Sequence, residues 1–231
     1  GDRKGRLISR PLFINPLNDL LQAKIAATDI FHLPDHIYNI NEDPRFPKYF
    51  NILKQELITS RYMLYEFGAM QLDHLSDNDV FLENGLDGVE FGYRNELLKN
   101  SLRISYSIFD KIALFLNDYM KVGLKVDGLN FRNIWGKYQN KKLELFPCFA
   151  NNDNWPLRGL YFLSKDLYSP NFKDVAEPEA RELHEIRNMA EHRYLGIQEY
   201  AAQVDNTDYM KYITVDDLHS KALKMLSLAR E

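Results

Sequence analysis

Residues 97–120, LLKNSLRISYSIFDKIALFLNDYM, hold the strongest structural signal in this chain of 231 residues. Apolar side chains recur there at steps of three and four residues, and they include Leu97, Leu98, Leu102, Ile104, Ile108, Phe109, Ile112, Phe115 and Leu116. Only a helix places residues at this spacing on a common stripe. The periodic run begins at Tyr93 and ends at Met120, so we expect one long helix of that extent packed against a core.

Two more helices are expected upstream of this run. Residues 47–72 repeat the same apolar spacing, which predicts a second long helix. Asn15 followed by Pro16 is a cap residue before a first-turn proline, and it predicts a short helix over residues 15–28. Between these helices and the long run lies DHLSDNDVFLENGLDG, residues 73–88, whose acidic and turn-forming residues predict a loop.

The segments downstream of the long run also have helical character. The expected helices cover residues 130–141, the segment from Asn154 to just before Pro170, the segment that Pro178 opens, and a last helix that starts at the capping box of residues 214–217 and runs toward Arg230. Short stretches such as LELFPCF, residues 143–149, could be extended, but no alternating pattern is long enough to predict a sheet. The sequence therefore predicts an all-α fold, a helical bundle.

Composition narrows the classes of function. Hydrophobic residues make up 45% of the chain, and the only cysteine is Cys148, which excludes an internal disulfide framework and indicates a reducing compartment such as the cytoplasm. No apolar run is long enough to cross a bilayer, so we expect no membrane partner. The net charge of −4 argues against a protein that coats nucleic acid through its overall field, but it leaves room for a local basic patch. The chain begins with Gly rather than Met, as a piece of a longer chain would.

An unusual choice of polar residues stands in residues 183–197, LHEIRNMAEHRYLGI, which we predict to be helical throughout. At about 100° per residue, one side of this helix is apolar and forms a core stripe made of Leu183, Ile186, Ala190, Tyr194 and Ile197. The opposite face holds His184, Asn188, His192 and Leu195, with Arg187 at the border. A face opposite the core normally carries solvated charged residues. Two imidazoles, a carboxamide and a leucine there predict a cleft or a contact with a second copy of the chain.

Arginine together with histidine suits a phosphodiester substrate. The guanidinium of Arg187 can hold a phosphate through two hydrogen bonds and offset charge in the transition state, and the imidazole of His192 can transfer a proton near neutral pH. With RNA, the ribose 2′-OH supplies the nucleophile, so neither a metal nor a cofactor is required. HEIRNMAEH lacks the spacing of the zinc-binding motif HEXXH, and His184 and His192, eight residues apart, make a poor metal pair.

The segment RNMAEH, residues 187–192, resembles the signature of HEPN domains, in which Arg and a polar residue are followed by His after four to six intervening residues. The run at residues 97–120 is similar to the long first helix of these bundles. The resemblance covers roughly residues 90–231. It implies an all-α, HEPN-like bundle over residues 91–231, with residues 1–90 as an N-terminal helical extension and acidic loop. It also implies a dimeric, metal-independent endoribonuclease in which the motif helices of two copies face each other.

The resemblance also implies roles for single residues. Arg187 is expected to bind the scissile phosphate, His192 to transfer the proton, and Asn188 to orient the imidazole or the substrate. A role as a toxin or an anti-phage defence effector, with an antitoxin or an N-terminal sensor domain as a further partner, follows from family analogy alone. The alternatives are a non-catalytic dimerisation or nucleotide-binding module that uses the same polar face, and a structural helical scaffold.

Simpler interpretations of the same residues stay open. His192 could be an ordinary surface histidine, and Arg187 could pair with Glu191, four residues further along the helix. His184 is expected to support the site or its interface rather than to act as a second base. Asp110, inside the long helix, could orient the motif arginine or bridge to another helix of the bundle.

A second, basic segment is a candidate for RNA binding. Residues 131–142, FRNIWGKYQNKK, alternate aromatic rings with the cations Arg132, Lys137, Lys141 and Lys142. Such a pattern is typical of surfaces that bind single strands. We favour the other interpretation of this segment, an amphipathic helix whose rings lie in the core and whose lysines are solvated.

Overall fold

The computed structural model describes residues 12–19, 27–34, 37–38, 41, 43–70, 74–83, 85, 87–139, 142–168, 178–202 and 204–231, and over these residues the chain is mostly helical. It divides into two compact units. The first unit consists of residues 1–106 and 189–231, and the second unit of residues 107–188. Two helices, α3 (Tyr93–Tyr119) and α6 (Pro178–His192), run through the points of division. None of the helices in the described residues combines the length and the apolar character needed to span a membrane.

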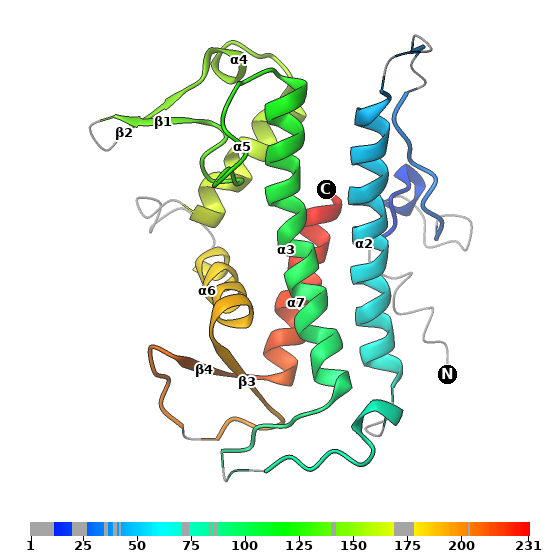
Figure 1. The fold of residues 1–231 in the computed structure, drawn as a ribbon, viewed down its shortest axis with the longest axis vertical. Helices are drawn as coiled ribbons and strands as arrows, with labels where there is room; N and C mark the ends of the chain where they lie inside the picture. The colour runs from blue at the N-terminus through cyan, green and yellow to red at the C-terminus, as the bar shows by residue number, and fades with distance from the viewer. Residues whose placement is uncertain are drawn as a thin grey trace. The chain divides into compact units, whose positions relative to one another are not determined.

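The first unit is built around α2 (Arg45–Ala69), the first half of α3, and α7 (Val215–Arg230), as Figure 1 shows. Helix α2 packs on α7, and it approaches α3 where both helices carry serines. The Ser60 hydroxyl donates to the Ser101 carbonyl at 2.9 Å and lies 2.7 Å from the Ser105 hydroxyl. All three serines are buried, and their small side chains let the two helices lie close together while the hydroxyls keep hydrogen-bond partners.

The helices predicted for the first unit are largely confirmed. The long helix expected over residues 93–120 is α3, and the one expected over residues 47–72 is α2. The capping box also forms, because the Thr214 hydroxyl accepts a hydrogen bond from the backbone N–H of Asp217 at 3.2 Å where α7 begins. Local periodicity and cap chemistry were therefore sufficient to locate these elements.

The helix expected over residues 15–28 and the loop expected over residues 73–88 are only partly described by the structure. Of the helix expected over residues 15–28, the structure shows one 3-10 turn, η1 (Pro16–Asp19), and residues 20–26 lie outside the described part. The loop expected over residues 73–88 is confirmed where the chain is described, apart from the short 3-10 helix η3 (Leu75–Asp77). The domain boundary expected between residues 90 and 91 stays a prediction.

A pair of parallel strands follows α6 in the first unit. β3 (Tyr194–Gln198) pairs with β4 (Met210–Thr214). Gly196 allows this close approach, because a Cβ at that position would lie 2.9 Å from Met210 Cε and 3.0 Å from Val89 Cγ2. The prediction of a helix through residue 197 is therefore wrong, and with it the assignment to helix faces of Tyr194, Leu195 and Ile197.

The second unit contains the rest of α3, a hairpin, α4 (Pro147–Ala150), α5 (Trp155–Tyr168) and most of α6. In the hairpin, β1 (Gly136–Gln139) pairs antiparallel with β2 (Lys142–Leu145). The stretch LELFPCF, which could have been extended, is divided between β2 and α4, and the sheet that was not predicted has two short strands here. The helix expected from Asn154 is confirmed as α5, and the Asn154 side-chain oxygen accepts a hydrogen bond from the Leu157 N–H at 3.1 Å.

The helix predicted over residues 130–141 is wrong. Residues 131–135 form turns, and the side-chain oxygen of Asn130 accepts hydrogen bonds from two backbone N–H groups of these turns, at 3.0 and 3.2 Å. β1 then begins at Gly136. Only glycine fits at this position, because a Cβ there would lie 2.0 Å from the carbonyl oxygen of Glu144 on β2. A side chain and a paired strand therefore satisfy backbone groups that a helix would have paired internally.

The aromatic rings of this segment divide between core and surface. Phe131 and Trp135 are buried with their ring centroids 5.6 Å apart, and the indole N–H of Trp135 donates to the Phe131 carbonyl at 2.8 Å. Tyr138 on β1 is exposed. The interpretation that assigned the rings to the core is confirmed for Phe131 and Trp135, although neither ring stands on a helix.

Candidate functional site

The candidate site is built on α6, whose last residues are RNMAEH. The apolar side of this helix is fixed by the buried side chains of Leu183, Ile186 and Met189. The last hydrogen bond of the helix runs from the Arg193 N–H to the Met189 carbonyl at 3.1 Å. His192 is therefore the last helical residue, and its side chain is exposed to solvent at the C-terminal end of α6.

A short chain of hydrogen bonds links the polar residues that precede His192. The Arg187 guanidinium donates through Nη1 to the side-chain oxygen of Asn188 at 3.1 Å. The Asn188 amide nitrogen lies 3.0 Å from His184 Nε2. An amide nitrogen can only donate, so Nε2 accepts and the proton of the neutral ring sits on Nδ1. Asn188 therefore holds Arg187 on one side and His184 on the other.

The environment of His184 disfavours the charged form of its ring. Burial lowers the pKa of His184 below its ordinary value, and the positive charges of Arg187 and Arg132 lower it further, against smaller opposite effects of Glu185 and Asp110. The ring of Tyr168 stands edge-on to the imidazole, with centroids 5.3 Å apart. The lowered pKa disfavours the charged ring, which is consistent with the hydrogen bond that Nε2 accepts from Asn188.

This lowered pKa predicts a pH dependence of stability. Below the ordinary pKa of histidine, about 6.5, the unfolded chain takes up a proton at residue 184 before the folded chain does. The free energy of unfolding should therefore fall as the pH drops through 6.5 toward the lower pKa of the folded state. Replacing His184 with Gln keeps an acceptor for Asn188 and should reduce this slope, as thermal melts of parent and variant between pH 7.5 and 5.5 would show (roughly the range of histidine titration). An unchanged slope would contradict the assignment.

Arg132 lies close enough to His184 to lower the pKa of that residue. The turn that carries Arg132 is held by Asp110 of α3, whose carboxylate accepts a hydrogen bond from the Phe131 N–H at 3.0 Å. Asp110 thus anchors the turn on which Arg132 stands. The structure brings Arg132, one of the four basic residues expected to bind RNA, into electrostatic range of the motif helix.

The three lysines of the basic segment are placed less fully. Lys137 is exposed on β1, opposite Glu144 of β2. Lys141 lies outside the described residues, and of Lys142 the structure describes the backbone in β2 but not the side chain. Their expected contact with RNA stays a prediction.

A salt bridge attaches the end of α6 to α3 within the first unit. Glu191 Oε2 lies 3.0 Å from Nε of Arg103 on α3. This pair is part-exposed, and the hydrogen bond to Glu191 is the main reason why the pKa of Arg103 is raised. The salt bridge therefore holds Glu191, the residue that directly precedes His192. Glu191 was considered above as a partner of Arg187.

The polar face of α6 was predicted from the sequence, but the contacts of His184 within the site were not. His184 and Asn188 are four residues apart on one helix, a spacing from which their hydrogen bond could have been predicted. The position of Arg132 near His184 had no such signal, because it depends on a turn held by a side chain of another helix. Among the residues that the structure describes, no three His, Cys, Asp or Glu side chains gather closely enough to bind a metal. The expected metal independence stays a prediction.

The model of the LA2681-like HEPN family matches residues 37–231. The match begins ahead of α2 and thus takes in the helices of both units. Searches of curated proteins and of solved structures gave no match.

Proposed function

Because the chain belongs to the LA2681-like HEPN family, we propose that it is a metal-independent endoribonuclease whose active site is completed in a homodimer. HEPN domains as a class are nucleotide-binding or ribonuclease-like modules that commonly bind RNA and dimerise. The observation that carries the proposal for this chain is the arrangement on α6. Arg187, held by Asn188, precedes an exposed His192 at the end of the same helix.

In the proposed reaction, Arg187 binds the scissile phosphate and offsets the negative charge that develops there. His192 removes the proton of the ribose 2′-OH, the 2′-oxygen forms a bond to phosphorus, and the bond from phosphorus to the 5′-oxygen breaks. The His192 of the second copy gives the proton that the 5′-oxygen needs. The products are a 2′,3′-cyclic phosphate and a 5′-hydroxyl.

The neighbours of Arg187 have supporting roles in this proposal. Asn188 positions the guanidinium through the 3.1 Å hydrogen bond, and its own amide is fixed by His184. Arg132 adds a second positive charge beside the same group of residues, which favours an anionic substrate. His184, neutral and occupied at Nε2, orients Asn188 and takes no proton from the substrate.

The dimer follows from a chemical requirement. Cleavage by the 2′-OH uses one base and one acid, and each α6 exposes one His192. A two-fold axis near the ends of two α6 helices would bring both imidazoles together. Leu195, which was expected to add an apolar contact on the same helix face, lies in β3 and lends this argument no support.

A non-catalytic RNA- or nucleotide-binding module is the second candidate. It is favoured by one observation: within the described part of the chain, no hydrogen bond orients the imidazole of His192. In either case we propose a cytoplasmic protein. Action as a toxin or anti-phage effector, with an antitoxin or a sensor domain as partner, belongs to the endoribonuclease proposal.

Incubation of the purified full chain with RNA in excess EDTA tests this function. We expect the RNA to be cut, because the proposed chemistry uses no metal, and we expect fragments that carry a 2′,3′-cyclic phosphate and a 5′-hydroxyl. A DNA strand of the same sequence should survive, because it lacks the attacking hydroxyl. Cleavage that EDTA stops, or fragments with a free 3′-hydroxyl, would contradict the mechanism. RNA that is bound but left intact would favour the second candidate.

A further inference from the structure

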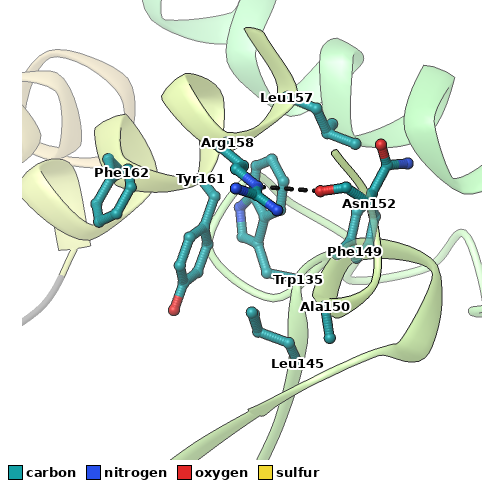
Figure 2. A pocket seen from close by; sticks show the side chains of 9 residues that line it. All are labelled: Trp135, Leu145, Phe149, Ala150, Asn152, Leu157, Arg158, Tyr161 and Phe162. Carbon is teal, nitrogen blue, oxygen red and sulfur yellow. Dashed lines mark hydrogen bonds between the residues drawn. The ribbon is translucent and has the colours of Figure 1, made fainter. Parts of the chain in front are cut away.

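A pocket lined by aromatic rings lies in the second unit, formed by β2, α4, α5 and the turn before β1 (Figure 2). Its cavity volume is about 200 Å³, below the size range of pockets for drug-sized molecules, and it opens to solvent. Its walls include Trp135, Phe149, Tyr161, Phe162 and Arg158. The Trp135 ring forms the buried base of this cluster, with centroids 5.1 Å from Phe149 and 5.5 Å from Tyr161.

Rings and cations alternate along the face of α5 that borders this pocket. Trp155, Arg158, Phe162 and Lys165 follow one another at steps of three, four and three residues, which places them on one helix face. We call these four residues the α5 row. The two rings are exposed, Trp155 by 76% and Phe162 by 59%. The Arg158 guanidinium lies 5.3 Å from the centroid of Trp155, and Lys165 Nζ lies 5.5 Å from that of Phe162. Row and pocket are continuous, because Arg158 and Phe162 belong to both.

The charge of this part of the chain favours an anionic ligand. Residues 121–165 hold eight Lys or Arg against three Asp or Glu, in a chain whose net charge is −4. The Arg158 guanidinium is anchored at the pocket by a hydrogen bond from Nε to the Asn152 carbonyl at 3.0 Å, drawn as a dashed line in Figure 2. It also pairs with Asp153 at 3.0 Å, but the Asp153 side chain is fully exposed, so a phosphate could displace it at little cost. Asp166, one turn beyond Phe162, is the nearest acid on the row's own helix face.

We propose that the pocket and the α5 row bind single-stranded RNA, with one unpaired base inserted among the pocket rings. A planar base can stack on aromatic walls, which an aliphatic side chain cannot do, and exposed rings next to cations are the arrangement by which proteins bind single strands. Neighbouring bases stack on Trp155 and Phe162, and Arg158 and Lys165 contact the phosphates. The inference rests on the proposed function only for the choice of RNA as the polymer.

Binding can be measured separately from cleavage. The full chain carrying His192→Ala is titrated into fluorescein-labelled oligo(U) and oligo(A), and the anisotropy is followed at several salt concentrations. Phe162→Ala in this background should weaken binding by about fivefold or more, because one stacked base is lost. Arg158→Ala should lower the slope of log K against log salt by about 0.7, the value for one phosphate contact in a single strand.

Two matched variants control for these effects. Phe81→Ala removes a ring that is 90% exposed in the first unit, and Lys48→Ala removes an exposed cation that, like Arg158, pairs with an aspartate. Neither should change the affinity or the salt slope. Ala150→Leu narrows the pocket without deleting a contact, and it should weaken binding if a base enters there.

The proposal is overturned if Phe162→Ala binds as the parent does, or if it loses no more affinity than Phe81→Ala. It is also overturned if neither oligonucleotide binds, or if Ala150→Leu binds both as the parent does. Cleavage by the chain with His192 intact is tested in a separate assay. A ribonuclease that binds its substrate elsewhere would therefore be distinguished from a chain that has no ribonuclease activity.

Discussion

Replacing His192 with Ala is expected to lower the rate of RNA cleavage by about 10²–10⁴-fold, because a positioned proton-transfer group contributes that much to catalysis. Arg187→Ala should cost about 10²–10³-fold, since it removes the charge that stabilises the phosphate in the transition state. Both side chains lie outside the buried face of α6, so circular dichroism and melting temperature should match those of the parent. The measurement is the single-turnover cleavage rate of a labelled RNA.

Residues of the same types outside α6 serve as controls. His32 and Arg45 are both exposed and remote from α6 in the sequence, and their replacement by Ala should leave the rate unchanged. Asn188→Ala should have a smaller effect than either motif variant, because Asn188 positions Arg187 but transfers no proton. A His192→Ala chain that cleaves RNA as fast as the parent would sink the mechanism.

Mixing chains can show whether the site is shared between copies. In the proposed dimer each cleavage uses the His192 of both copies, one as the base and one as the acid. A mixed dimer of the parent and His192→Ala lacks one of these groups, so an excess of His192→Ala chains should lower the activity of the parent. Activity that stays proportional to the concentration of the parent, with both chains shown to be dimeric by sedimentation, would mean that each site is built within one copy.

Trp135→Ala is expected to destabilise the fold by about 3–5 kcal/mol, the usual loss when a buried large aromatic residue is truncated. The side chain is 1% exposed and packs against Phe131, Phe149 and Tyr161. Its removal also leaves the Phe131 carbonyl without the indole donor. For a chain of this length the melting temperature should fall by about 6–20 °C.

Trp155→Ala is the matched control, because it removes the same side chain from a site that is 76% exposed. Its ring contacts Arg158, and the change in stability should stay within about 0.5 kcal/mol. Equal losses for the two tryptophan variants in differential scanning calorimetry would show that Trp135 does not hold the core of the second unit.

The C-terminal end of α6 could not be located from the sequence. The apolar residues of 183–197 recur at three- and four-residue steps, which predicted one helix, but the helix ends at His192. Beyond it, β3 gains its hydrogen bonds from β4, and the partner strand begins sixteen residues after β3 does. A pattern read along the chain contains no record of such a partner, and five residues are too few for alternation to stand out.

The helix predicted over residues 130–141 was wrong for a related reason. Phe131, Trp135 and Tyr138 have helical spacing, yet the first two are placed in the core by turns that Asp110 and Asn130 cap with their side chains. Those hydrogen bonds compete with the helical ones, and Asp110 comes from another helix. Exposed rings that alternate with cations are found on α5, where their spacing could have been read from the sequence.

What the sequence established is therefore what depends on local physics. Helices α2, α3, α5 and α7 follow from apolar periodicity and cap residues, and RNMAEH was recognised because its chemistry resides within six consecutive residues. The end of α6 and the approach of Arg132 to His184 depend on contacts between residues farther apart in the chain. Their free energy arises only once the partner segments are in place, so the tertiary structure alone could supply them.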